Sequence, residues 1–138
     1  MSLDRNGVVI SISKVYANVN EIKGSEWYDH RQYQPKWNSP DDYFLLKKVG
    51  RGKYSTVFKG LYKKKKEVAI KILVPLDPRR YLREIKIMHN LGDGPNIVKL
   101  VDLVRDQATG IYSFVSEWVD FYDWRSLYMS FTLDDIRI

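Results

Sequence analysis

Three groups of residues along this chain have the types and spacing needed to hold a phosphate. The stretch GRGKYSTVFKG, residues 50–60, places two glycines one residue apart before a small polar residue and a β-forming run. Glycine weakens a strand interior, so such a pair marks a sharp turn or the close approach of another molecule. Lys71 closes the apolar run VAIK, and Glu84 follows within a helical pattern. The lysine needs an anion and the glutamate needs a cation, so we expect Lys71 and Glu84 to pair.

Each group also has an ordinary structural explanation. The glycines alone would suit a hairpin turn, and Lys71 alone could extend its ammonium to water from a strand end. Glu84 alone could form a surface pair one helical turn away. We favour a shared site because all three occur together at these spacings. Nothing helical follows the glycines, which argues against a Rossmann or P-loop site.

The hydrophobic pattern predicts the elements that must position these residues. Strands are expected at 43–49, 56–62, 67–74, 97–104 and 111–119, the last two joined by the turn DQATG. Asp77 as N-cap and Pro78 as first residue begin a helix with apolar positions at Leu82, Ile85 and Met88. We expect Gly92 to end it in the left-handed conformation. The predicted order is therefore β-β-β-α-β-β.

The two ends of the chain differ from this middle part. Residues 1–42 read as an extended arm that carries large aromatic side chains and is interrupted by prolines. A short helix is expected at 121–127, and another begins at 132–138 with Thr132 as its cap. Domains rarely end where a helix begins, so we expect the 138 residues to be part of a longer chain.

Composition excludes several functional classes. The 138 residues contain no cysteine and two histidines, which excludes a disulfide scaffold and makes a zinc site a poor fit. An apolar content of 44% suffices for a packed core, and a net charge of +6 favours anionic partners. No apolar run is long enough to cross a membrane. We expect a soluble, intracellular protein.

The motifs together resemble a known family. The glycine-rich hairpin, VAIK and the helix glutamate, in this order, are similar to the N-terminal lobe of a eukaryotic protein kinase. The finer match, from about Val15 to Arg137, resembles the catalytic alpha subunit of casein kinase 2. It rests on the runs VYANVN, EWYD, WNSPDDY, GRGKYSTVF, KIL, REIKIMHNL and GPNIVKL.

This resemblance implies an α+β fold: a kinase N-lobe with a five-stranded antiparallel sheet and one αC-type helix, followed by the hinge and the beginning of the helical C-lobe. The implied organisation is an extended arm at 1–42, an ATP-binding N-lobe at 43–118, and the hinge with the start of the C-lobe at 119–138. The implied location is the cytoplasm and nucleus.

The resemblance also implies roles for single residues. Lys71 would hold the α- and β-phosphates of ATP, and Glu84 would fix Lys71 through an ion pair. Trp27, Tyr28 and Trp37 would belong to an arm that braces the activation segment. The remaining nucleotide-binding positions implied are Val49, Gly50, Arg51, Gly52, Ser55, Val57, Ala69, Ser116, Glu117 and Val119.

Two departures from the family pattern change what is expected. Ser116 stands where this subunit has a bulky aromatic residue, so we expect a pocket behind the adenine. The lysine cluster that recognises acidic substrates is replaced by Asp77-Pro78-Arg79-Arg80, with Arg83 and Lys86 beyond it. Four lysines occupy 63–66 instead, and we interpret them as a solvated turn rather than a nucleic-acid site.

An apolar set could be core or a docking surface, and alternation along the strands does not decide which. In the family, equivalent positions dock a regulatory beta subunit, and we favour that interpretation. The set is Leu45, Phe58, Ile70, Ile72, Val104 and Val115.

The sequence therefore predicts a Ser/Thr kinase catalytic subunit that moves the γ-phosphate of ATP, or of GTP, to acidic protein substrates with Mg²⁺. The catalytic loop and the metal-binding DFG motif do not occur in these 138 residues, so we expect this portion alone to be inactive. The alternative is a non-catalytic kinase lobe that binds a nucleotide or a regulatory subunit. We expect neither a membrane nor a specific nucleic acid as partner.

Overall fold

The computed structural model describes residues 2–3, 9–10, 17–121 and 123–137. The chain forms two compact units, one of Met1–Lys36 with Leu76–Ile97 and the other of Trp37–Pro75 with Val98–Ile138. Val15 and Tyr16, where the resemblance begins, and Ile138 lie outside the described residues.

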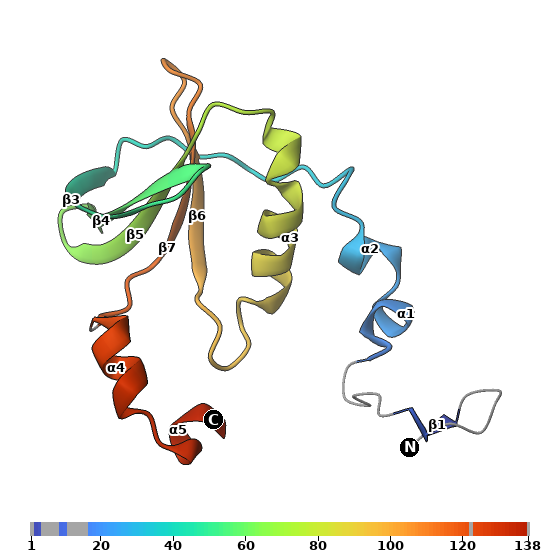
Figure 1. The fold of residues 1–138 in the computed structure, drawn as a ribbon. Coiled ribbons are helices and arrows are strands. Elements are labelled where there is room, and N and C mark those ends of the chain that lie inside the picture. Colours follow the sequence, from blue (N-terminus) through green and yellow to red (C-terminus); the bar gives the residue numbers. More distant parts are fainter. Residues whose placement is uncertain (1, 4–8, 11–16, 122, 138) are drawn as a thin grey trace. The chain divides into compact units, whose positions relative to one another are not determined.

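The second unit is built on a five-stranded antiparallel sheet, as predicted (Figure 1). Its strand order is β3-β4-β5-β7-β6, so the chain lays down three neighbouring strands and then adds the last two in reverse order. The strands are β3 (Tyr43–Arg51), β4 (Ser55–Tyr62), β5 (Lys66–Leu73), β6 (Leu100–Arg105) and β7 (Tyr112–Glu117).

Cross-strand register assigns each side chain to one face of the sheet. Val57 pairs with Lys71, which pairs with Phe114, so these three side chains share one face. Ile70 pairs with Val115 on the opposite face. There Val68, Ile70, Val104 and Val115 form a buried apolar cluster.

The end of the predicted arm is fastened to this sheet. Asn38 forms an isolated parallel bridge with Val104, and its side chain donates to Asp102 Oδ1 at 2.7 Å. The Tyr43 hydroxyl donates to Asp102 Oδ2, also at 2.7 Å. The pKa of Tyr43 is raised, mainly because the residue is partly buried and secondly because its hydroxyl donates this hydrogen bond to Asp102. Trp37 packs edge-on against Tyr112, with 4.5 Å between the ring centroids.

The turn DQATG between β6 and β7 is confirmed. Asp106 accepts from the Thr109 hydroxyl at 2.6 Å and from the Ala108 amide at 3.1 Å. Gly110 has a φ of 71°, a conformation that glycine adopts without steric cost. The hydrogen bond from Thr109 is the main reason that the pKa of Asp106 is lowered.

The first unit contains the helix expected after residue 77. Asp77 is an N-cap, as predicted, and accepts from the Arg79 amide at 2.9 Å, but it caps a 3-10 turn, and the N-cap of the α-helix itself is Tyr81. Pro78 begins a single 3-10 turn, η1 (Pro78–Arg80), and the α-helix proper is α3 (Leu82–Leu91). The helix ends at Leu91 with Gly92 as its C-cap, as predicted, but the left-handed conformation predicted for Gly92 is wrong, because its φ is −61°. The helix needs no left-handed residue there, since a turn follows directly.

Short elements complete the described chain. The predicted arm contains β1 (Ser2–Leu3), β2 (Val9–Ile10), α1 (Val19–Lys23) and α2 (Ser25–Tyr28), so it is not extended throughout. The Asn90 side chain of α3 donates to the Trp27 carbonyl at 2.6 Å. The Lys86 ammonium lies 4.6 Å from the centroid of the Tyr33 ring.

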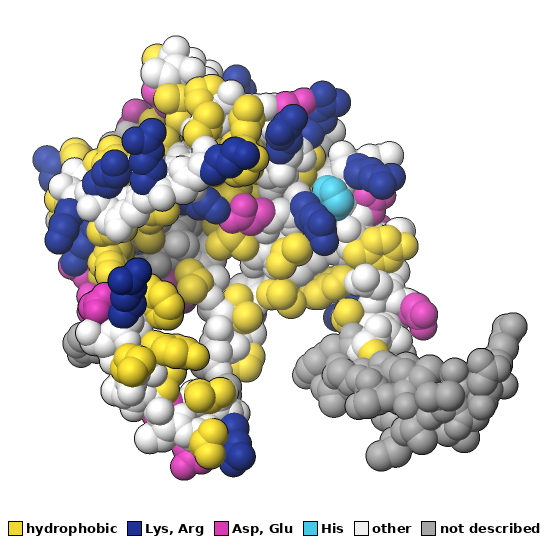
Figure 2. All heavy atoms as spheres, in the orientation of Figure 1, with side chains coloured by type: hydrophobic (Ala, Val, Ile, Leu, Met, Phe, Trp, Pro, Cys, Tyr) yellow, Lys and Arg dark blue, Asp and Glu magenta, His cyan; other side chains and the backbone are white. Residues whose placement is uncertain are grey.

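The C-terminal helices are α4 (Trp124–Ser130) and α5 (Leu133–Arg137). The helix predicted at 121–127 therefore begins later, where Asp123 caps it by accepting from the Ser126 amide at 3.2 Å. Thr132 caps α5 as predicted: its hydroxyl oxygen accepts from the Asp135 amide at 3.4 Å, and Asp135 Oδ2 accepts from the Thr132 amide at 2.8 Å. Figure 2 shows hydrophobic side chains gathered on these two helices, among them Met129 at 84% exposed. None of the described helices has the length and apolarity that crossing a bilayer requires.

Candidate functional site

The two glycines lie at the tip of the hairpin that joins β3 to β4. Gly50 pairs with Val57, and Arg51 with Thr56, so the ladder continues to the last residue of β3. The Gly52 amide donates to the Ser55 carbonyl at 2.7 Å and closes the turn. The tip is joined to the end of β5 through the Val74 amide, which donates to the Tyr54 carbonyl at 2.9 Å.

The hairpin itself does not require either glycine. The described glycines with left-handed φ are Gly24 and Gly110, so neither Gly50 nor Gly52 adopts that conformation. A Cβ added at Gly50 would meet nothing within 4 Å, and one at Gly52 would meet only Ser55, at 3.8 Å. A glycine pair can serve a sharp turn or the close approach of another molecule. Because the turn does not need glycine here, close approach of another molecule is the explanation that remains.

One face of the sheet collects four of the predicted site residues next to this hairpin. Val57 lies opposite Lys71 on the neighbouring strand, and Ala69 lies opposite Ser116. Because directly opposed residues of antiparallel strands point to the same side, all four side chains share one face. The structure therefore brings together residues from three strands that are separated by up to 59 positions, the interval from 57 to 116.

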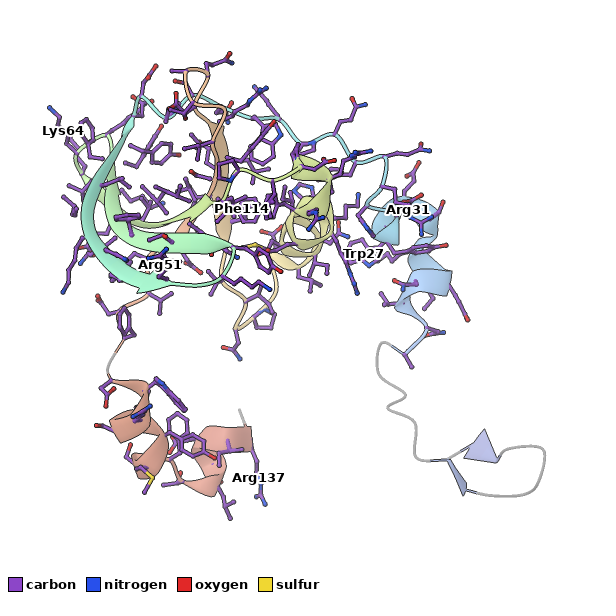
Figure 3. All side chains as sticks on the ribbon, turned by 45° about the horizontal axis from the view of Figure 1, so that its top comes forward. Trp27, Arg31, Arg51, Lys64, Phe114 and Arg137 are labelled. Atoms are coloured by element: carbon purple, nitrogen blue, oxygen red, sulfur yellow. The ribbon has the colours of Figure 1, made fainter. Side chains whose placement is uncertain are left out.

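Sequence reasoning missed Phe114, which also belongs to this face. Phe114 of β7 pairs with Lys71, and the Lys71 ammonium lies 5.7 Å from the centroid of its ring. Phe114 is 2% exposed, and Figure 3 labels it within the sheet. The alternation of Phe114 with Ser116 along one strand was the available signal, but it acquires meaning only once the register is known.

The predicted pair of Lys71 and Glu84 involves both compact units. Lys71 lies on β5 in the sheet unit, and Glu84 lies in the first turn of α3 in the other unit. Their ion pair therefore stays a prediction.

The chain leaves β7 at the residues expected to form the hinge. The Glu117 amide donates to the Lys99 carbonyl at 3.0 Å, and the Lys99 amide donates to Glu117 Oε1 at 2.9 Å. The last ladder pair joins Val68 and Glu117, so the peptide groups of Trp118 and Val119 lie beyond the sheet. Val119 is 55% exposed.

The opposite face of the sheet carries an apolar cavity of about 310 Å³. Leu45, Ile70, Ile72, Val104 and Val115 line it, together with Tyr43 and residues of the β6–β7 turn. Phe58 does not belong to the lining, although its pairing with Ile70 puts it on the same face. Leu45 is 52% exposed whereas Val115 is fully buried, so the set is partly core and partly surface.

Part of the positive charge that precedes α3 is neutralised locally. Arg79 forms an ion pair with Asp77, the residue that also caps the 3-10 turn. The hydrogen bonds from Arg79 lower the pKa of Asp77 to about 2. Arg80 and Arg83 remain exposed. The uncompensated positive charge in this region is therefore smaller than a count of basic residues suggests.

The four-lysine turn is built as a tight hairpin between β4 and β5. Lys63 and Lys64 both have left-handed φ values, of 49° and 59°. The Lys64 ammonium lies 5.2 Å from the centroid of the Phe44 ring.

As for metals, the described residues contain no group of three or more acidic or histidine side chains placed to hold an ion.

The fold and this site define a protein kinase domain: residues 43–137 match the protein kinase domain family, and the chain belongs to it. Over 132 residues it is 42% identical to a protein described as a probable serine/threonine-protein kinase of Dictyostelium discoideum. That alignment covers 95% of this chain and 22% of the relative, so the chain spans about a fifth of that protein's length.

Proposed function

We propose that this chain is the nucleotide-binding part of a Ser/Thr protein kinase of the casein kinase 2 type. The complete protein would transfer the γ-phosphate of ATP, with GTP as a second donor, to Ser or Thr in acidic sequences. The observation that carries the proposal is the shared sheet face of Val57, Ala69, Lys71 and Ser116 beside a hairpin in which a Cβ would meet no steric clash at either glycine.

Each residue has a physical role in this proposal. Val57 and Ala69 offer an apolar surface to the adenine, and the Lys71 ammonium stabilises the charge on the α- and β-phosphates. Gly50 and Gly52 allow backbone amides of the hairpin to approach the phosphates. Mg²⁺ would neutralise the β- and γ-phosphates when bound, and the proposal assigns its ligands to parts of the protein beyond these 138 residues.

The test is a phosphotransfer assay on the complete protein as its source produces it. Wild type should phosphorylate a serine peptide with acidic flanking residues better than the same peptide with neutral flanks. Lys71→Met should abolish turnover without changing the circular dichroism spectrum or the thermal midpoint. Equal rates for both peptides would contradict the casein kinase 2 type, and full activity of Lys71→Met would contradict the kinase mechanism.

The second candidate function is a docking module, favoured by the cavity on the opposite sheet face. We propose that a regulatory beta-type subunit inserts an apolar side chain there, against Leu45 and Ile72. Leu45→Glu would place a charge at the rim and should prevent co-purification with that subunit while leaving the fold intact. Binding that survives Leu45→Glu but is lost in Lys71→Met would contradict this surface.

One mass measurement separates the two candidates. An intact mass well above 16.3 kDa for the native protein would fit a complete kinase, and phosphotransfer becomes the expected activity. A mass close to 16.3 kDa would favour the docking module, because the catalytic loop would then be lacking.

A further inference from the structure

The segment that follows β7 has little support from the sheet. Its residues lie beyond the last ladder pair, Val68 with Glu117, and Val119 and Phe121 are 55% and 67% exposed. A segment of this kind samples several conformations unless side chains restrain it. If its peptide groups bind a ligand, that freedom is lost on binding and weakens the affinity.

One side chain from the middle of the sheet reaches this segment. Lys59 of β4 lies opposite Ala69 in the register and so shares the face of Ala69 and Ser116. Its ammonium is 2.8 Å from Glu67 Oε1 on β5 and 4.8 Å from the centroid of the Trp118 ring. The Lys59 side chain is 26% exposed, which reduces screening by water compared with a fully exposed pair.

Trp118 in turn fixes the shape of its own segment. Its indole N–H donates to Asp120 Oδ1 at 2.9 Å, and its ring lies 5.9 Å from that of Phe121, centroid to centroid. Glu117, the last residue of β7, forms two hydrogen bonds with the backbone of Lys99. The segment is therefore fixed at Glu117 by backbone contacts and at Trp118 by Lys59.

We propose that Lys59 is a positioning residue that holds Trp118, and with it the peptide groups of residues 118–120, ready for the base of the nucleotide. This inference rests on the proposed function, because it assumes that these peptide groups bind a nucleotide base. Glu67 restrains the Lys59 ammonium, the ammonium restrains the Trp118 ring, and the ring restrains the backbone. Lys59 itself need not touch the nucleotide.

The test compares Lys59→Met, Lys59→Arg and Lys65→Met in the same chain. Methionine keeps the length and apolar stem of Lys59 but removes the charge, whereas arginine keeps the ion pair and the cation–π contact. Lys65 is an exposed lysine of the β4–β5 turn and serves as the matched control. Amide hydrogen exchange of the peptide covering residues 117–121 is measured without nucleotide, and the Kd for a fluorescent ATP analogue is measured separately.

Lys59→Met should speed exchange in this peptide by about fivefold and weaken the nucleotide Kd by a similar factor. Exchange in β5 should stay unchanged, and Lys59→Arg and Lys65→Met should behave as wild type. Unchanged exchange in Lys59→Met would overturn the restraint, and faster exchange with an unchanged Kd would overturn the positioning role. If wild type binds no nucleotide, the proposed function fails. The ratio of the amide exchange rates of Lys59→Met and wild type then still decides whether Lys59 holds the segment.

Discussion

The glycines of β4 and of the neighbouring hairpin should respond in opposite ways to the same added methyl group. At Gly60, a Cβ would lie 2.5 Å from Ile70 Cδ1 and 2.7 Å from the Phe44 carbonyl oxygen. The second of these is backbone and cannot rotate away, so Gly60→Ala should destabilise the fold by about 1–3 kcal/mol. At Gly52 the nearest atoms belong to Ser55 and are 3.8 Å away, an ordinary contact distance.

Gly52→Ala should therefore keep or raise the free energy of unfolding, by up to about 1 kcal/mol, since alanine restricts the unfolded chain more than glycine does. The same methyl group occupies space that the proposal assigns to the phosphates. The affinity for ATP should fall by about tenfold, or about 1.4 kcal/mol. Under the proposed function, the nucleotide rather than the fold is what requires glycine at this position.

Urea unfolding followed by circular dichroism measures the first quantity, and titration with a fluorescent ATP analogue measures the second. A loss of more than about 1 kcal/mol in Gly52→Ala would mean that the hairpin needs the glycine for its own geometry. Wild-type affinity in Gly52→Ala would refute the close approach of phosphates. Gly60→Ala provides the scale for a real steric clash.

Three further predictions concern other parts of the chain. Ile85→Ala should cost about 2–5 kcal/mol of stability in urea unfolding, whereas Ile87→Ala on the same helix should cost far less, because Ile85 is 0% and Ile87 is 47% exposed. The pKa of Asp106 is lowered in the folded state, so its stabilisation is complete above about pH 4 and is lost as the pH falls through the folded pKa. Asp106→Asn should make the urea midpoint depend less on pH between about pH 5 and 2.5 than it does in wild type. An unchanged pH dependence would contradict the assigned hydrogen bonds. Ser116→Phe should weaken the binding of ATP analogues with bulky N6 substituents but leave the binding of ATP itself unchanged. Equal affinities of wild type and Ser116→Phe for these analogues would contradict a pocket beside Ser116.

The sequence was sufficient to predict five strands and their succession along the chain, because β-forming runs separated by turn residues leave few alternatives. Some ends were misplaced: the strand expected at 97–104 is Leu100–Arg105, and the one expected at 111–119 is Tyr112–Glu117. The cap at Asp77 and the turn at Asp106 were also predictable, since both depend on local hydrogen bonds. The helix start was less accurate. Pro78 favours the first turn of any helix, and the pattern cannot distinguish a 3-10 turn at residues 78–80 from an α-helical one.

What the sequence could not provide is the register across strands. Alternation places Ile70 and Ile72 on one face, but only the pairing of Lys71 with Val57 and Phe114 assembles the opposite one. Phe58 was grouped with Ile70 and Ile72 through the family resemblance; the register does put it on their face, but it does not line the cavity there. The contact between Lys59 and Trp118 joins β4 to the segment that follows β7, and these two strands are not adjacent in the sheet, so no local motif could have indicated it.

The central claim is that the sheet face with Lys71 meets the phosphates of ATP. The most direct measurement uses an ATP analogue that carries a lysine-reactive acyl group on its terminal phosphate, followed by mass spectrometry of the labelled peptides. We predict labelling of Lys71 that an excess of ATP suppresses. Labelling confined to exposed lysines such as Lys64, or labelling of Lys71 that ATP does not compete, would contradict the claim.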